Sequence, residues 1–161
     1  MILPKIYPIT NRELAESSHT EQTKQLIDAG AEMIQLREKK ALSGDFFSDA
    51  DEATKLARKH GAAIILNDRV DIALAVGAAG VHLGQDDLSP HDARKILGND
   101  LIIGYSTHSL AQALEAKEFP VDYIAVGPVF PTSTKENPDE VVGLDGVRAV
   151  SYTHLTLPTI T

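Results

Sequence analysis

The chain has 161 residues, which is enough for one domain with a sizeable hydrophobic core. Its formal net charge of -8 argues against a general nucleic-acid or membrane-surface role, because such roles need a basic face. The sequence contains no cysteine, which excludes disulfide bonds, thiolate metal sites and a cysteine nucleophile.

Short apolar runs alternate with amphipathic segments along the chain. The apolar runs predict six strands, at residues 6–10, 33–37, 63–66, 81–83, 101–104 and 123–126. The segments between them predict helices at residues 20–29, 45–60, 70–76, 90–97 and 109–118, with a further helix at 143–150. Strands separated by helices imply parallel pairing through right-handed crossovers.

Polar residues follow nearly every predicted strand, and this distribution bears on the fold class. It favours a (β/α)8 TIM barrel, whose active site lies along the carboxyl ends of all its strands, over an open sheet with one binding crevice. A closed barrel needs eight strands, so we expect residues 1–150 to form an incomplete barrel that lacks strands seven and eight. Residues 151–161 show no helical period, and we expect them to be a non-native tail.

Five charged side chains each lie just past a predicted strand: Arg37, Lys39, Asp68, Asp87 and Lys135. In a barrel, these positions share one rim. An anion bound by so acidic a protein must be held locally, which makes the three cations informative. Three cations and two acids on one rim indicate a site for a polyphosphate held with a divalent metal.

The second strand shows how such side chains are directed. A period of two places Gln35 and Arg37, with Lys39 in the same phase, on the face opposite Ile34 and Leu36. If Leu36 packs under the helices, Arg37 points toward the mouth of the barrel, where an unpaired charge is costly. Arg37 therefore meets either an anionic ligand or, alternatively, an internal carboxylate.

Two acids follow neighbouring strands, Asp68 after Asn67 and Asp87 after the fourth strand. Such a pair without clustered histidines suits Mg²⁺, which takes one or two protein carboxylates and completes its shell with water and phosphate. The alternatives are that Asp68 caps the following helix and that Asp87 is a solvated turn residue.

Hydroxyl groups follow strands five and six. Thr132, Ser133 and Thr134 precede Lys135 in a proline-containing loop that could donate several hydrogen bonds to phosphate, although an ordinary surface loop is the alternative. Ser106 offers a further hydroxyl at the end of strand five. His82 and His108 are interpreted as structural rather than as ligands.

Five motifs, at residues 35–39, 67–68, 80–87, 104–106 and 127–135, occur in order on successive strands. Together they resemble the thiamine phosphate synthase (thiamine-phosphate pyrophosphorylase) family over residues 5–150. The resemblance implies a (β/α)8 barrel and a transferase that condenses 4-amino-2-methyl-5-hydroxymethylpyrimidine diphosphate with thiazole phosphate. The products would be thiamine phosphate and diphosphate, formed by a Mg²⁺-assisted dissociative substitution.

The resemblance also implies a role for individual residues. The pyrimidine diphosphate would be bound by Gln35, Arg37, Lys39, Asn67, Ser106 and Lys135, with Tyr7 near the pyrimidine and Leu36 and Glu38 also in contact with substrate. The Mg²⁺ ligands would be Asp68 and Asp87. The thiazole phosphate would be held by Thr132 and Thr134, with Ser133 also in contact with substrate. The catalytic groups would be Arg37, Lys39, Ser106 and Lys135.

The resemblance ends before the family's loops after strands seven and eight, so a C-terminally truncated member is expected. Two alternatives remain: a thiazole tautomerase of the same barrel family, and a non-catalytic truncated fragment. The tautomerase is disfavoured because the residues needed for a diphosphate substrate are present. We expect small-molecule partners, no nucleic acid, no membrane and a cytoplasmic location, since no apolar run could span a bilayer. A homo-oligomer is left open.

Overall fold

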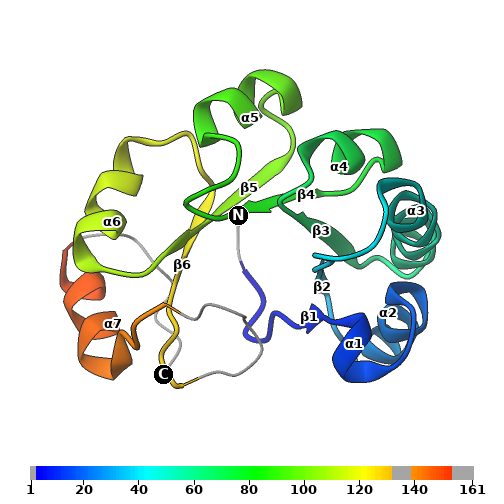
Figure 1. The fold of residues 1–161 in the computed structure, drawn as a ribbon, viewed down its shortest axis with the longest axis horizontal. Helices are drawn as coiled ribbons and strands as arrows, with labels where there is room; N and C mark the ends of the chain where they lie inside the picture. Colours follow the sequence, from blue (N-terminus) through cyan, green and yellow to red (C-terminus); the bar gives the residue numbers. More distant parts are fainter. Residues whose placement is uncertain (1–2, 132–138, 154–161) are drawn as a thin grey trace.

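The computed structural model describes residues 3–131 and 139–153. Within them, six parallel strands form one sheet in which each strand pairs with the next along the chain. The sheet curls into a half-barrel with the helices on its outer side (Figure 1). The strands are β1 (Ile9–Thr10), β2 (Met33–Leu36), β3 (Ala63–Asn67), β4 (Gly80–Leu83), β5 (Ile102–Thr107) and β6 (Tyr123–Val126). The predicted alternating fold with a parallel sheet is confirmed at this level.

The helices cover the outside of the sheet in chain order (Figure 1). They are α1 (Arg12–Ala15), α2 (His19–Asp28), α3 (Ser43–Lys59), α4 (Val70–Val76), α5 (Pro90–Leu97), α6 (Leu110–Glu115) with the 3-10 turn η1 (Ala116–Glu118), and α7 (Gly143–Tyr152). The predicted start of α5 is confirmed, because the Ser89 side chain accepts from the Asp92 N–H and Pro90 occupies the first turn. No helix in the described parts of the chain is long and apolar enough to cross a membrane.

The first strand and its surroundings differ from the prediction. The expected strand at 6–10 is only two residues long, because Pro8 has no N–H to donate to a neighbouring strand. The helix α1 was not predicted. It forms because the Asn11 side chain accepts a hydrogen bond from the Leu14 N–H and so caps the turn.

Two other elements are longer than predicted. Strand β5 continues past Gly104 to Thr107, since Tyr105, Ser106 and Thr107 all pair with β6. Helix α7 continues to Tyr152, two residues into the segment expected to be a non-native tail. The rest of that tail, residues 154–161, lies outside the described residues.

The two faces of the curled sheet carry different residues. Outward-facing strand residues are buried in one apolar core beneath the helices: Ile34, Leu36, Ile64, Leu66, Val81, Leu83 and Ile103. The residues that alternate with them face the inside of the half-barrel: Gln35, Ile65, Asn67, His82, Gly104 and Ser106. The period of two therefore directs apolar side chains to the helices and leaves mostly polar or small residues in the interior, with Ile65 as a buried apolar exception.

Candidate active site

A cavity of about 890 Å³ lies over the carboxyl ends of the strands. Nine of the polar or charged residues that line it come from five strands or the segments that flank them: Tyr7, Gln35, Arg37, Lys39, Asn67, Asp68, His82, Asp87 and Ser106. All of these except His82 are residues singled out from the sequence. The parallel arrangement explains the grouping, because the strands end at one rim although their residues are far apart in the sequence.

The two cations that follow β2 both line this cavity. Arg37 is half-buried and, within the described chain, forms no ion pair with a carboxylate. The alternative of an internal partner for Arg37 is therefore not supported, and its guanidinium remains available to an anion. The Lys39 ammonium lies against the Asp68 carboxylate, which is mostly buried. A ligand held by Lys39 would therefore lie beside Asp68.

Asp68 directly follows β3 and has an unusual backbone conformation, with φ of 64° in the left-handed region. A non-glycine residue in that region is uncommon and tends to mark functional sites. Its side chain does not cap the next helix, because the N-cap of α4 is Arg69 and no side chain forms the capping hydrogen bond. The capping alternative for Asp68 is therefore wrong, and its carboxylate faces the cavity instead.

Asp87 is a close neighbour of Asp68. Its Oδ2 accepts a hydrogen bond of 2.7 Å from the Gly84 N–H, so part of the turn alternative holds. Burial raises the pKa of Asp87, and the hydrogen bond and negative charge of Asp68 raise it further, against the opposing charge of Lys39. Two carboxylates that repel each other in this way favour a cation between them.

The Asp68 and Asp87 carboxylates offer oxygen ligands of the kind that hard metal ions prefer. The described residues contain no group of three or more histidine or carboxylate side chains placed to hold a metal. Two neighbouring carboxylates nevertheless suit Mg²⁺, which commonly uses only one or two and takes its other ligands from water and phosphate. The residues present therefore fit a hard divalent cation bound together with a phosphate ligand.

A chain of polar contacts crosses the inside of the half-barrel next to these charges. It runs from Gln35 through Tyr7, Tyr123 and His82 to Ser106. Tyr123 was absent from the predicted site and His82 was interpreted as structural. Gly104 lies beside both residues in the sheet, but this register arises only in the assembled sheet and gave no signal in the sequence.

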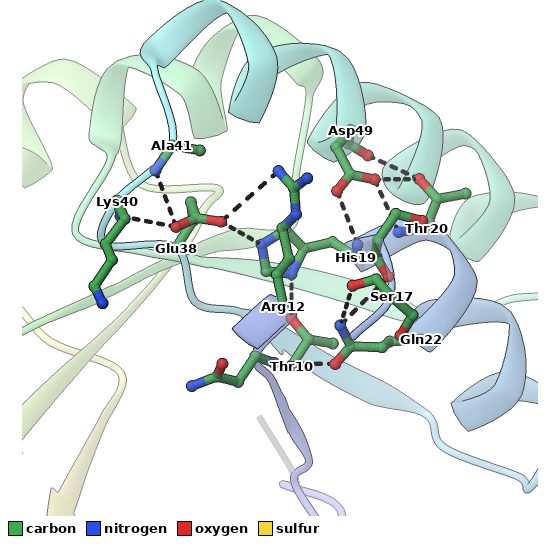
Figure 2. A network of polar contacts seen from close by, with 12 residues as sticks. Thr10, Arg12, Ser17, His19, Thr20, Gln22, Glu38, Lys40, Ala41 and Asp49 are labelled. Carbon is green, nitrogen blue, oxygen red and sulfur yellow. Dashed lines mark hydrogen bonds and ion pairs between the residues drawn. The ribbon is translucent and has the colours of Figure 1, made fainter. Parts of the chain in front are cut away.

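Two predicted substrate-binding residues point away from the cavity. The Leu36 side chain is fully buried in the outer core, since it alternates with Gln35. The Glu38 carboxylate turns outward and accepts hydrogen bonds from the Lys40 and Ala41 N–H groups, at 2.8 and 3.1 Å (Figure 2). The side-chain alternation stops where β2 ends, so the phase of residue 38 could not be extrapolated from the strand.

Glu38 belongs to a polar network behind the rim (Figure 2). Its Oε2 lies 3.5 Å from His19 Nε2 and 3.9 Å from Arg12 Nη1. His19 is fully buried, and its Nδ1 lies 2.7 Å from the Thr10 hydroxyl of β1. Although burial raises the pKa of Glu38, the N–H groups of Lys40 and Ala41 bring it below its ordinary value. The ionised carboxylate thus links the loop after β2 to α1 and α2.

The remaining predicted site residues are Thr132, Ser133, Thr134 and Lys135, and they lie outside the described residues.

A curled parallel half-barrel with outer helices and charged residues at the carboxyl ends of its strands is the arrangement of an α/β enzyme. Comparison with known proteins identifies the family: the family model described as thiamine monophosphate synthase matches residues 6–161. The chain belongs to this family, whose members named below are transferases.

Individual relatives agree with this assignment. A thiamine-phosphate synthase from Clostridium novyi (strain NT) is 40% identical over 157 residues, covering 97% of this chain and 76% of the relative. One from Shouchella clausii (strain KSM-K16) is 43% identical over 155 residues, covering 96% and 74%. The solved structure of a thiamine phosphate pyrophosphorylase from Pyrococcus furiosus superimposes with a TM-score of 0.81 at 37% identity, over 91% of this chain and 69% of that chain.

Proposed function

We propose that the cavity is the active site of a thiamine-phosphate synthase. It would join hydroxymethylpyrimidine diphosphate to a thiazole phosphate and release diphosphate. The observation that carries this proposal is the grouping of Arg37, Lys39 and Ser106 with the carboxylates of Asp68 and Asp87 around one cavity. A diphosphate needs this combination of cations, hydroxyl donors and metal-binding acids, whereas a substrate with a single phosphate does not.

The reaction requires negative charge to develop on a leaving group. The bond between the pyrimidine methylene carbon and the diphosphate oxygen breaks, the bonding electrons go to diphosphate, and the thiazole nitrogen supplies the pair for the new C–N bond. Arg37 and Lys39 stabilise the departing oxygens, and the gain is largest in the transition state because the charge is greatest there. No general base is needed, because the attacking nitrogen carries no proton.

The metal has a defined place in this proposal. Asp68 and Asp87 would hold Mg²⁺, and the bound ion would neutralise negative charge on the diphosphate. Lys39 already contacts Asp68, so the diphosphate and the two carboxylates would be neighbours. Gln35, Asn67 and Tyr7 line the inner end of the cavity and offer amide and hydroxyl groups to the pyrimidine. Thr132, Ser133, Thr134 and Lys135 are proposed to bind the thiazole phosphate and the diphosphate.

We further propose that the six strands are the first six of an eight-stranded barrel. The chain spans about three quarters of the length of the two named synthases, and the sheet that it forms is open between β1 and β6 (Figure 1). Extending the chain with the C-terminal residues of the Clostridium novyi relative should raise both the melting temperature and the affinity for thiazole phosphate. Unchanged values would contradict the eight-stranded barrel.

The activity is tested by measuring diphosphate release and thiamine phosphate formation from the two substrates with Mg²⁺. Arg37→Ala should lower kcat/KM about 100-fold, as expected for loss of one charge-stabilising donor. The matched control is Arg148→Ala, an exposed arginine on α7 whose loss should leave the rate unchanged. Isomerisation of the thiazole without any use of the pyrimidine diphosphate would instead identify a thiazole tautomerase.

A further inference from the structure

We propose that Ser106 is the end of a directed hydrogen-bond chain, and that His82 and Tyr123 are positioning residues that aim the Ser106 hydroxyl hydrogen at the cavity. This role rests on the proposed function, because a diphosphate oxygen is the acceptor that such a donor would meet. It adds two residues to the site that contribute through Ser106 rather than through contact with the leaving group.

Four polar contacts make up the hydrogen-bond chain. Gln35 Nε2 donates to the Tyr7 hydroxyl at 3.3 Å, and the Tyr7 and Tyr123 hydroxyl oxygens are 3.0 Å apart. The Tyr123 hydroxyl lies 3.0 Å from His82 Nδ1, and His82 Nε2 lies 2.8 Å from Ser106 Oγ. Gln35, His82 and Tyr123 are all at least nine-tenths buried, and the contact between His82 and Tyr123 is shielded from water.

An amide nitrogen can only donate, so the Tyr7 oxygen accepts from Gln35. We assign the Tyr7 hydrogen to its other hydroxyl neighbour, Tyr123, and the Tyr123 hydrogen to His82 Nδ1. In a neutral His82 ring, this assignment places the ring hydrogen on Nε2. His82 therefore donates to Ser106 Oγ, and the remaining Ser106 hydrogen is free to point into the cavity that this residue lines.

Both tyrosines keep their hydrogens under ordinary conditions. Burial raises the pKa of Tyr7 above its ordinary value. Burial raises the pKa of Tyr123 as well. Neither hydroxyl therefore ionises near neutral pH, and the direction of donation is preserved.

Gly104 is a second, independent sign that the contact between His82 and Tyr123 is built into the sheet. Gly104 pairs with His82 on one side and with Tyr123 on the other. A Cβ at this position would lie 2.1 Å from Tyr123 Cζ and 2.6 Å from His82 Nδ1. Any side chain here would therefore separate the two rings, so glycine is required for their approach rather than for backbone freedom.

The direction has a chemical consequence for the ligand. A serine that accepts from histidine presents its hydrogen to an anion, and hydrogen bonds to charged groups are the strong ones. If the chain ran the other way, Ser106 would donate to His82 and present only lone pairs to a diphosphate oxygen. A serine hydroxyl can either donate or accept a hydrogen bond. The directed hydrogen-bond chain thus makes Ser106 a donor toward the cavity.

The hydrogen position on His82 is measured directly by ¹⁵N NMR of the histidine side chains, with the His82 signals assigned by His82→Gln. The expected result is a neutral ring with hydrogen on Nε2 and none on Nδ1. Hydrogen on Nδ1 alone would mean that Ser106 donates inward, which would overturn the proposal. This measurement needs neither substrate nor activity.

A double-mutant cycle then tests whether Tyr123 works through Ser106, with the affinity for inorganic diphosphate and Mg²⁺ measured by calorimetry. Ser106→Ala should weaken binding about tenfold, and Tyr123→Phe about threefold. In the Ser106→Ala background, Tyr123→Phe should have almost no further effect, because the hydroxyl that it orients is gone. The control Tyr152→Phe, at an exposed position on α7, should change nothing.

Equal losses from Tyr123→Phe with and without Ser106 would overturn the positioning role, and so would unchanged affinity in Ser106→Ala. His82→Gln keeps an amide donor and should retain more affinity than His82→Leu, a difference that a purely structural role would not produce. If the wild-type chain binds diphosphate without forming thiamine phosphate, the proposed function fails while this cycle still gives its answer.

Discussion

Replacing Glu38 by alanine separates two roles that its position next to Arg37 and Lys39 could suggest. Its carboxylate side chain is only 11% exposed and accepts two backbone hydrogen bonds from the loop that follows β2 (Figure 2). At about 1.5 kcal/mol for each hydrogen bond to a charged group, Glu38→Ala should lower the free energy of unfolding by about 3 kcal/mol. For a chain of this size, that corresponds to a fall in melting temperature of about 8 °C.

Calorimetry of unfolding measures this loss, and titration with diphosphate and Mg²⁺ measures the effect on the site. We expect diphosphate affinity to fall as well, because the loop carries Lys39 and begins at Arg37. The matched control is Glu13→Ala, whose side chain is 65% exposed and pairs with Lys40. That pair should contribute less than about 1 kcal/mol. Lost affinity with unchanged stability in Glu38→Ala would refute the anchoring role and restore Glu38 as a direct ligand of the substrate.

Three further predictions concern other parts of the fold. Asp68→Asn should keep the left-handed backbone, which asparagine tolerates, and should leave the melting temperature nearly unchanged. Mg²⁺-dependent diphosphate binding should fall more than about tenfold. A diphosphate affinity equal to that of the wild-type chain would contradict a metal role for Asp68. Burial lowers the pKa of His19 in the folded state. The contribution of the neutral ring to stability is therefore complete above the pKa of the unfolded state, near 6.5, and is lost as the pH falls below that value. His19→Gln should flatten this part of the stability profile, and an unaltered slope would refute the assignment. Gly80→Ala would place a Cβ 2.0 Å from the Ile102 carbonyl oxygen, so it should lower the free energy of unfolding by about 3 kcal/mol. In the control Gly44→Ala, the added Cβ meets no atom within 4 Å, so this variant should be neutral or stabilising. Chemical denaturation measures both free energies.

The strand pattern was predictable because the period of two is a local property of each strand. Ile34 and Leu36 are in the outer core and Gln35 is inside, as the alternation requires. Residues that follow strands could be placed on one rim for the same reason. The direction of Glu38 was not predictable, because it depends on hydrogen bonds of a loop rather than on strand periodicity.

The polar chain depends on contacts between residues far apart in the sequence. Tyr7 and Tyr123 are separated by 116 positions, and His82 and Tyr123 by 41. Their approach requires Gly104 between them, and the register that aligns these residues is a property of the assembled sheet. A histidine flanked by apolar residues gives no local sign of such partners.

The most direct test of the proposed function is the formation of thiamine phosphate by the purified chain, measured by chromatography with both substrates and Mg²⁺ present. We expect product with the wild-type chain and with Arg148→Ala, and about 100-fold less with Arg37→Ala. Equal product formation by Arg37→Ala would contradict the assignment of the diphosphate to this cavity.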